Sequence, residues 1–322
     1  MEAAIELARL TGVVLRREAI ELGADDRDLR RAVRAGVLIR IRQGAYTVPE
    51  LWAEAFPEER HRIRCEAVRR SVNGDIAFTH ASALVLMGID VWDVDLDQVH
   101  VTRLDGGIGR REHGVVHHVG RFDTDAAVQV GDYILSGPAA AVIENTTLTG
   151  VEGGLVSADS ALHQGFVTEE QLWRNFDERI QWPNSRSARM VLTLADGLSE
   201  SVGETRFRHL CWRAGLPKPE LQVKIYAPDG THFATCDFGW RDRRALGEFD
   251  GRIKYGRLLK PGQRVEDVIT AEKDREDKVR EYTDCIVMRF TWPDLGRPNS
   301  TAERVRRKLG HTGNFSRDLD AS

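Results

Sequence analysis

The sequence is poor in cysteine and has no long hydrophobic run, and both features exclude classes of protein. The four cysteines, Cys65, Cys211, Cys236 and Cys285, are far apart and form no CxxC pair. This spacing argues against a disulfide framework or a cysteine zinc site and favours reduced thiols in the cytosol. No segment approaches the roughly 18 apolar residues of a membrane helix, and the charges near the N-terminus argue against a signal peptide. We therefore expect a soluble, cytoplasmic protein with no membrane partner.

A strong excess of one charge is also absent. The formal net charge is -4 over 322 residues, so any contact with nucleic acid must come from local basic patches. Hydrophobic residues make up 41% and charged residues 30%, which is enough apolar material for more than one globular core. At roughly 100–200 residues per domain, the length predicts two or three domains.

Residues 1–50 have the pattern of three short helices and a hairpin, which predicts a winged helix-turn-helix. Asp25 or Asp26 is placed to cap the third helix, in which Leu29 and Val33 form an apolar stripe at helical spacing. Gly44 is placed to turn a two-stranded ribbon.

Basic residues dominate the third helix and the ribbon. They are Arg27, Arg30, Arg31, Arg34, Arg40 and Arg42, against one acid, Asp28. On the helix, Arg27, Arg31 and Arg34 share the face opposite the apolar stripe, and Arg40 and Arg42 alternate on the ribbon strand. A recognition helix needs this distribution, so we expect these six arginines to bind DNA. The alternative is a solvated face on a small helical cap.

The middle region, residues 57–198, predicts an α-rich α+β domain without an obvious active site. The segments 98–103 (QVHVTR) and 114–120 (GVVHHVG) alternate like strands, and helical patterns surround them. The histidines of this region lack a cysteine or aspartate at ligand spacing, and His117 and His118 should point to opposite faces of a strand. We interpret them as structural histidines.

The C-terminal region, residues 199–310, has the order helix, strand, strand, strand, helix, strand, followed by a flexible tail at 311–322. Acids fall at defined places: Glu204 in the first helix, Asp237 late in the second strand, and Glu248 and Asp250 at the end of the third. Because side chains alternate along a strand, Glu248 and Asp250 should share one face. Clustered carboxylates repel unless a cation lies between them, and oxygen ligands suit Mg²⁺ or Mn²⁺. The alternative is that these acids are only solvated.

The segments SVGETRFRHLCWRAGLPKPELQV, CDFGW, LGEFDG and VMRFTW resemble the PD-(D/E)XK nuclease superfamily, in particular its Vsr-like (very short patch repair endonuclease-like) branch. The resemblance spans about residues 198–295. It implies a metal-dependent DNA endonuclease fold in which Glu204, Asp237 and Glu248 bind Mg²⁺ or Mn²⁺.

The sequence departs from that pattern where the superfamily has a catalytic lysine, two residues after Glu248; here Asp250 stands there. The Vsr-like branch also has Asp-Gly here and usually a histidine four residues after that aspartate. Lys254 stands at the histidine's position: either it stabilises the transition state in the histidine's place, or the site is retuned or inactive. Arg275 and Arg289 match basic positions of the branch that hold phosphate, although Arg275 is equally well explained as a helix-surface charge.

The N-terminal segment with GVLIRIRQGAYTV, and THASALVLMGI and SADSALHQGFVT further on, resemble AbiEi-type antitoxins of abortive-infection toxin–antitoxin systems, over roughly residues 5–180. The resemblance implies DNA binding, repression of the protein's own operon and a cognate toxin partner. We thus expect an α+β multidomain DNA-binding protein with a C-terminal Mg²⁺-dependent endonuclease domain. The alternatives are a non-enzymatic regulator with a degenerate nuclease fold and a scaffold that binds a toxin.

Overall fold

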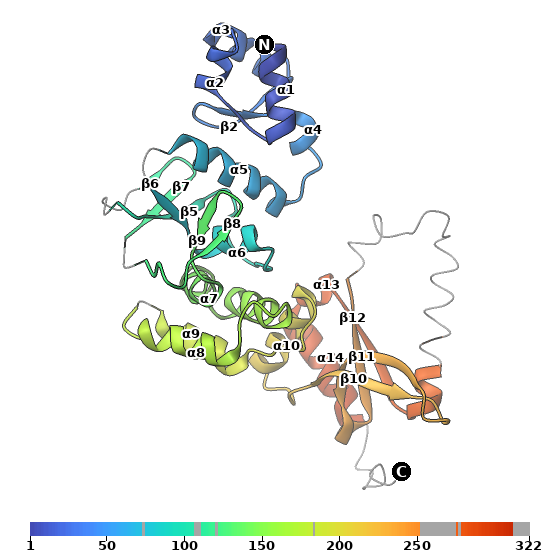
Figure 1. Ribbon diagram of the computed structural model, residues 1–322. Coiled ribbons are helices and arrows are strands. Elements are labelled where there is room, and N and C mark those ends of the chain that lie inside the picture. The colour runs from blue at the N-terminus through green and yellow to red at the C-terminus, as the bar shows by residue number, and fades with distance from the viewer. Residues whose placement is uncertain are drawn as a thin grey trace. The chain divides into compact units, whose positions relative to one another are not determined.

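The computed structural model describes residues 1–72, 75–105, 111–119, 122–182, 184–251, 275 and 278–311 (Figure 1). The chain divides into two compact units, Met1–Ala195 and Asp196–Ser322. Both contain helices and sheets, which confirms the mixed α+β class. In the part of the chain that is described, no helix is long and apolar enough to span a membrane.

The first unit begins with three helices and a three-stranded sheet. These elements are α1 (Glu2–Thr11), β1 (Val14–Leu15), α2 (Arg16–Glu21), α3 (Asp26–Arg34), β2 (Ile39–Arg42) and β3 (Ala45–Thr47). The strands pair antiparallel in the order β1-β3-β2. Leu29 of α3 and Leu38 are buried beside Ala4 and Ala8 of α1, so the apolar stripe of α3 faces a small core.

Helix α3 has well-defined ends. The carboxylate of Asp25 accepts hydrogen bonds from the backbone N–H groups of Arg27 and Asp28, and the carboxylate of Asp28 accepts one from the backbone N–H of Asp25, which completes a capping box. After the helix, Gly36 has φ +69°, a left-handed conformation that favours glycine. Asp25, rather than Asp26, is thus the cap.

Helices α4 (Pro49–Trp52) and α5 (Pro57–Ser71) follow the N-terminal sheet. Arg70 of α5 donates to the carboxylate of Glu18 at 2.5 Å and to the carbonyl of Val13 at 2.8 Å. Arg42 of β2 donates to the hydroxyl of Ser71 at 2.9 Å. Side chains of α5 therefore attach the N-terminal elements to the rest of this unit.

A six-stranded sheet forms the centre of the middle region, in the order β6-β7-β5-β4-β9-β8. Its strands are β4 (Ile76–Phe78), β5 (Val99–Arg103), β6 (Arg111–Glu112), β7 (Val115–His118), β8 (Val128–Val130) and β9 (Tyr133–Leu135). The helices are α6 (His80–Met87), α7 (Pro138–His163), α8 (Glu169–Glu178) and α9 (Ser185–Leu194). The prediction of an α-rich domain anticipated β5 and β7, but it missed the remaining strands because two or three residues show no alternation.

The second unit contains a four-stranded sheet in the order β10-β11-β12-β13. Its elements are α10 (Val202–Arg213), β10 (Glu220–Tyr226), β11 (His232–Trp240), the 3₁₀ turn Arg241–Arg243, β12 (Ala245–Asp250), β13 (Ile286–Thr291), α13 (Trp292–Leu295) and α14 (Pro298–His311). Residues 275 and 278–283 are helical. Strands β10, β11 and β12 pair antiparallel, whereas β12 and β13 pair in parallel. This is the predicted order of elements, extended by two C-terminal helices.

Aromatic side chains fill the core of the second unit. Phe207 of α10 stacks on Phe290 of β13 with ring centroids 3.8 Å apart, and both rings contact Phe238 of β11. Gly203 brings α10 against β12, since a Cβ there would lie 2.1 Å from the ring of Phe249. Helix α10 is therefore packed closely on the strand that carries the predicted acids.

Candidate functional site

The predicted acids of β11 and β12 meet where the two strands stop pairing. The last paired residues are Phe238 and Gly247, and Asp237 comes one residue beyond them. The carboxylate of Asp237 accepts a hydrogen bond from the backbone N–H of Phe249 at 2.6 Å. This bond holds the side chain between Glu248 and Asp250, the two acids of β12.

These three acids line one cavity of about 180 Å³ in the second unit. Its lining residues are Asp237, Glu248, Phe249, Asp250, Gly251, Arg275 and Arg289. Five of the seven are charged: Glu248 and Asp250 come from β12, and Asp237, Arg275 and Arg289 each come from another segment of the chain. The fold thus brings together five of the site residues predicted from the sequence: Asp237, Glu248, Asp250, Arg275 and Arg289.

Glu204 is not among the residues that line this cavity. Its carboxylate accepts hydrogen bonds from the hydroxyl of Ser201 at 2.7 Å, from the backbone N–H of Glu200 at 3.0 Å and from the amide of Gln222 at 3.2 Å. These bonds belong to the N-terminus of α10, where Ser201 is the cap. In this conformation Glu204 is a buried capping group that acts on the cavity through its charge.

Burial and mutual repulsion change the protonation of these carboxyl groups. Burial and the neighbouring Glu204 raise the pKa of Asp237 to about 7, and Glu248 acts in the same direction. The hydrogen bond from Phe249 and the charge of Arg275 oppose that rise. Burial also raises the pKa of Glu204. A buried carboxyl group with a raised pKa, such as that of Asp237, favours a bound proton or a nearby cation.

Two arginines line the cavity together with Glu248. Arg275 donates to the Glu248 carboxylate at 2.5 Å, with 45% of the arginine side chain exposed. Arg289 stands opposite Glu248 in the parallel pairing of β12 and β13. Arg275 therefore offsets the charge of the Glu248 carboxylate. Lys254 lies outside the described residues.

The donor atoms of the cavity suit a hard cation. Carboxylate oxygens from Asp237 and Glu248 are the ligands that Mg²⁺ and Mn²⁺ prefer, because these ions keep several waters and bind one or two protein carboxylates. The cavity has room for such waters at about 30 Å³ each. To bind the ion, Glu248 would give up its contact with Arg275. With two carboxylates and room for water, the residues present fit a divalent cation.

The predicted DNA-binding arginines fall into two groups. Arg27, Arg30, Arg31, Arg34 and Arg40 are exposed. Arg42 is half-buried and bound to Ser71, because the register of β2 shifts between Arg40 and Arg42. This irregularity turns Arg42 toward α5, so Arg42 is less available than Arg40 for a contact with DNA.

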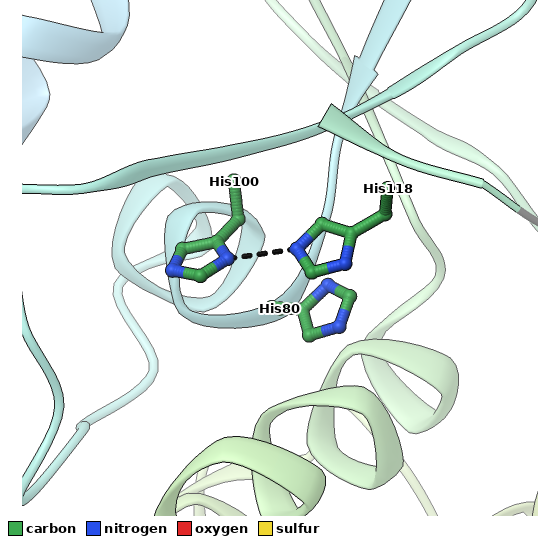
Figure 2. Close-up of side chains that lie close together, drawn as sticks. All are labelled: His80, His100 and His118. Atoms are coloured by element: carbon green, nitrogen blue, oxygen red, sulfur yellow. Dashed lines mark hydrogen bonds between the residues drawn. The ribbon is translucent and has the colours of Figure 1, made fainter. Parts of the chain in front are cut away.

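Three histidines lie together in the first unit. From the sequence we interpret them as structural histidines. They are His80, His100 and His118 (Figure 2). Burial and the two neighbouring imidazoles lower the pKa of His80 well below its usual value. The expectation that His117 and His118 point to opposite faces holds, since His117 is buried and His118 is partly exposed. No short-range spacing relates the three, so only the fold brings them together.

A family model matches the N-terminal part of the chain. Residues 2–49 match the family model described as "Transcriptional regulator, AbiEi antitoxin". The match covers α1 to β3, the part of the chain that carries the arginines, and it supports a DNA-binding regulatory role.

Two curated relatives are uncharacterized proteins of Mycobacterium tuberculosis, from the strains CDC 1551 / Oshkosh and ATCC 25618 / H37Rv. Each is 27% identical to this chain over 220 residues, which is 68% of this chain and 75% of the relative. Their descriptions name no activity.

Proposed function

We propose that this protein is a DNA-binding transcriptional regulator of the antitoxin kind, which contacts DNA through the arginine face of α3. The observation that carries the proposal is the coincidence of the AbiEi antitoxin match with this face. Helices α1 to α3 followed by the β2–β3 hairpin are the order of a winged helix, in which the third helix enters the major groove. The hairpin would be the wing.

The contacts of the arginines show which of them are available to DNA. Arg31 lies 3.4 Å from Asp28, but its side chain is 78% exposed, so this pair is weak. Arg16 of α2 is held in a bidentate pair with Asp26, both contacts being 2.7 Å. DNA phosphates would therefore meet the α3 arginines and Arg40 before Arg16 or Arg42. A cognate toxin protein is the second partner that an antitoxin requires.

The test of this function is binding of the full chain to the DNA upstream of its own gene. We expect specific binding that weakens steeply with salt, because each phosphate contact releases counterions. An unrelated duplex of the same length is the control. Equal affinity for both duplexes would leave only non-specific binding and would contradict a regulator.

A second function is favoured by the carboxylate cavity: phosphodiester hydrolysis that depends on Mg²⁺ or Mn²⁺. Its support is the convergence of Asp237, Glu248 and Asp250 in one cavity beside Arg275 and Arg289. Asp237 and Glu248 would hold the cation, and the two arginines would orient a DNA phosphate. When bound, the cation would polarise the phosphate and lower the pKa of a water.

Whether Lys254 supplies a basic group to this site decides whether the domain hydrolyses DNA. A site without its basic group would still bind a cation but would cut slowly, and the domain would then serve DNA or toxin binding. Titration calorimetry with Mn²⁺ and a cleavage assay on plasmid, single-stranded and mismatched DNA separate these outcomes. Binding with cleavage supports the nuclease, and binding without cleavage supports a regulator with a degenerate nuclease fold. A chain that does not bind Mn²⁺ would contradict the proposed metal site.

A further inference from the structure

Three imidazoles from separate segments meet in the first unit, away from the arginine face. His80 is the first residue of α6, His100 lies in β5 and His118 in β7 (Figure 2). Nδ1 of His100 and Nε2 of His118 are 2.8 Å apart, and the rings of His80 and His118 stack with centroids 3.8 Å apart. One ring nitrogen from each histidine lies within 4.8 Å of the other two.

The sheet explains why these rings converge. Strands β5 and β7 pair in parallel with His100 opposite Val116 and His118 opposite Thr102, so both histidines lie on the same face. Strand β4 pairs with the other edge of β5 and leads directly into α6, which begins at His80. Strands β5 and β7 and the helix that follows β4 thus each contribute one imidazole to the cluster.

The backbone at His80 is held in a strained conformation. Its φ is +52°, in the left-handed region that β-carbon-bearing residues rarely adopt. The backbone N–H of His80 donates to the carboxylate of Glu144 at 3.1 Å, and the hydroxyl of Ser136 donates to the same oxygen at 3.0 Å. The fold therefore stabilises a costly conformation whose effect is to turn the ring of His80 onto His118.

We propose that His80, His100 and His118 bind Zn²⁺ through one imidazole nitrogen each, with water in a fourth, tetrahedral position. Imidazole suits zinc, and three histidines with an open position are an established zinc geometry in proteins. Tetrahedral Zn–N bonds of 2.0–2.1 Å place nitrogens about 3.3 Å apart. The nitrogens of His100 and His118 are 2.8 Å apart and all three ligand atoms lie within 4.8 Å of one another, so ring rotations would complete the site.

The surroundings of His80 supply the outer shell that a histidine ligand requires. Its Nδ1 lies 3.0 Å from the hydroxyl of Thr79 and 3.8 Å from the carboxylate of Glu144, which leaves Nε2 for the ion. Such partners fix the tautomer and the ring orientation of a ligand. His80 and His100 are buried, at 7% and 6% exposure, whereas the partly exposed His118 gives the ion and its water a path to solvent. The ion would join β5, β7 and the start of α6.

The test is zinc binding by the full chain after treatment with a chelator. We expect one Zn²⁺ per chain by titration calorimetry and by metal analysis after dialysis. Co²⁺ is a second probe, because its visible spectrum reports a tetrahedral site with nitrogen ligands. His118→Gln and His100→Gln should each weaken Zn²⁺ binding by at least about 100-fold, the upper end for loss of an outer-shell partner, and abolish the Co²⁺ band.

Two controls make the result specific. His113→Gln alters an exposed histidine between β6 and β7 and should leave zinc affinity unchanged. The double variant Asp237→Asn, Glu248→Gln should also retain the zinc site, which separates it from the carboxylate cavity. If His100→Gln fails to fold, the partly exposed His118→Gln still decides the question. A wild-type chain that binds no zinc, or a folded His118→Gln chain with unchanged affinity, would overturn the proposal.

Discussion

The carboxylate of Asp237 accepts a hydrogen bond from the backbone N–H of Phe249 at 2.6 Å, and this bond joins β11 to β12 just beyond their last pair, Phe238 and Gly247. The ring of Phe249 packs against Gly203 and Trp292 of the second core. The geometry of the cavity is therefore coupled to the packing of α10. Changes on either side of this strand should affect both stability and cation binding.

The raised pKa of Asp237 predicts a pH-dependent stability in metal-free buffer. The folded value is about 7, whereas an unfolded aspartate titrates near 3.9, so the folded chain holds a proton that the unfolded chain releases. The contribution of this group to the free energy of unfolding should fall as pH rises from about 4 to about 7. Asp237→Asn should exceed wild type by about 1–3 kcal/mol at pH near 8 and lose that advantage near pH 4. Urea unfolding at both pH values measures this, and identical pH profiles would contradict it.

Loss of the carboxylates should remove cation binding without affecting DNA binding. Asp237→Ala and Glu248→Gln should each weaken Mn²⁺ binding by about 10-fold or more, because an ion of this kind depends on one or two protein carboxylates. Any cleavage of DNA should disappear with it. Asp242→Asn changes an exposed acid of the neighbouring turn and serves as the control. Unaltered Mn²⁺ affinity in both site variants would place the cation elsewhere.

Arg275 provides a separate test, because its guanidinium competes with a cation for Glu248. Arg275→Gln should therefore tighten Mn²⁺ binding, by about 2-fold to 5-fold for a partly exposed pair worth up to about 1 kcal/mol. If the same arginine also orients a phosphate, cleavage should fall while Mn²⁺ binding improves. Weaker Mn²⁺ binding would show instead that Arg275 supports the site.

The close approach of α10 to β12 can be tested at Gly203. Gly203→Ala would place a Cβ 2.1 Å from the ring of Phe249, and such overpacking should cost about 1–3 kcal/mol of unfolding free energy. Gly310→Ala, in α14, meets nothing within 4 Å and should be neutral or slightly stabilising. Thermal or urea unfolding compares the two. A Gly203→Ala chain as stable as wild type would show that the helix can move aside.

Local sequence signals predicted the elements that carry the two sites. The strand that carries Glu248 and the cap at Asp25 each depend on a few neighbouring residues, and both are found where the sequence predicts them. The short strands β4, β8 and β9 could not be predicted, since three residues cannot show a period.

Features that depend on distant contacts could not be predicted from the sequence. The pair of Arg275 with Glu248 joins residues from separate elements, and Arg42 turns toward Ser71 only because β2 carries a bulge. The histidine cluster needs the order of β4, β5 and β7 in the sheet. Glu204 was assigned to a metal from a resemblance, whereas its hydrogen bonds are those of a helix terminus.

The most direct test of DNA recognition by α3 is the salt dependence of DNA binding by the full chain. It is measured by fluorescence anisotropy for wild type and for the double variant Arg31→Ala, Arg34→Ala. The double variant should bind about 10-fold more weakly, with a slope of log affinity against log salt reduced by about 2, one for each lost phosphate contact. Arg174→Ala, Arg186→Ala removes the same charge from exposed positions of α8 and α9 and should behave as wild type. An unchanged slope and affinity in the α3 variant would contradict DNA recognition by this helix.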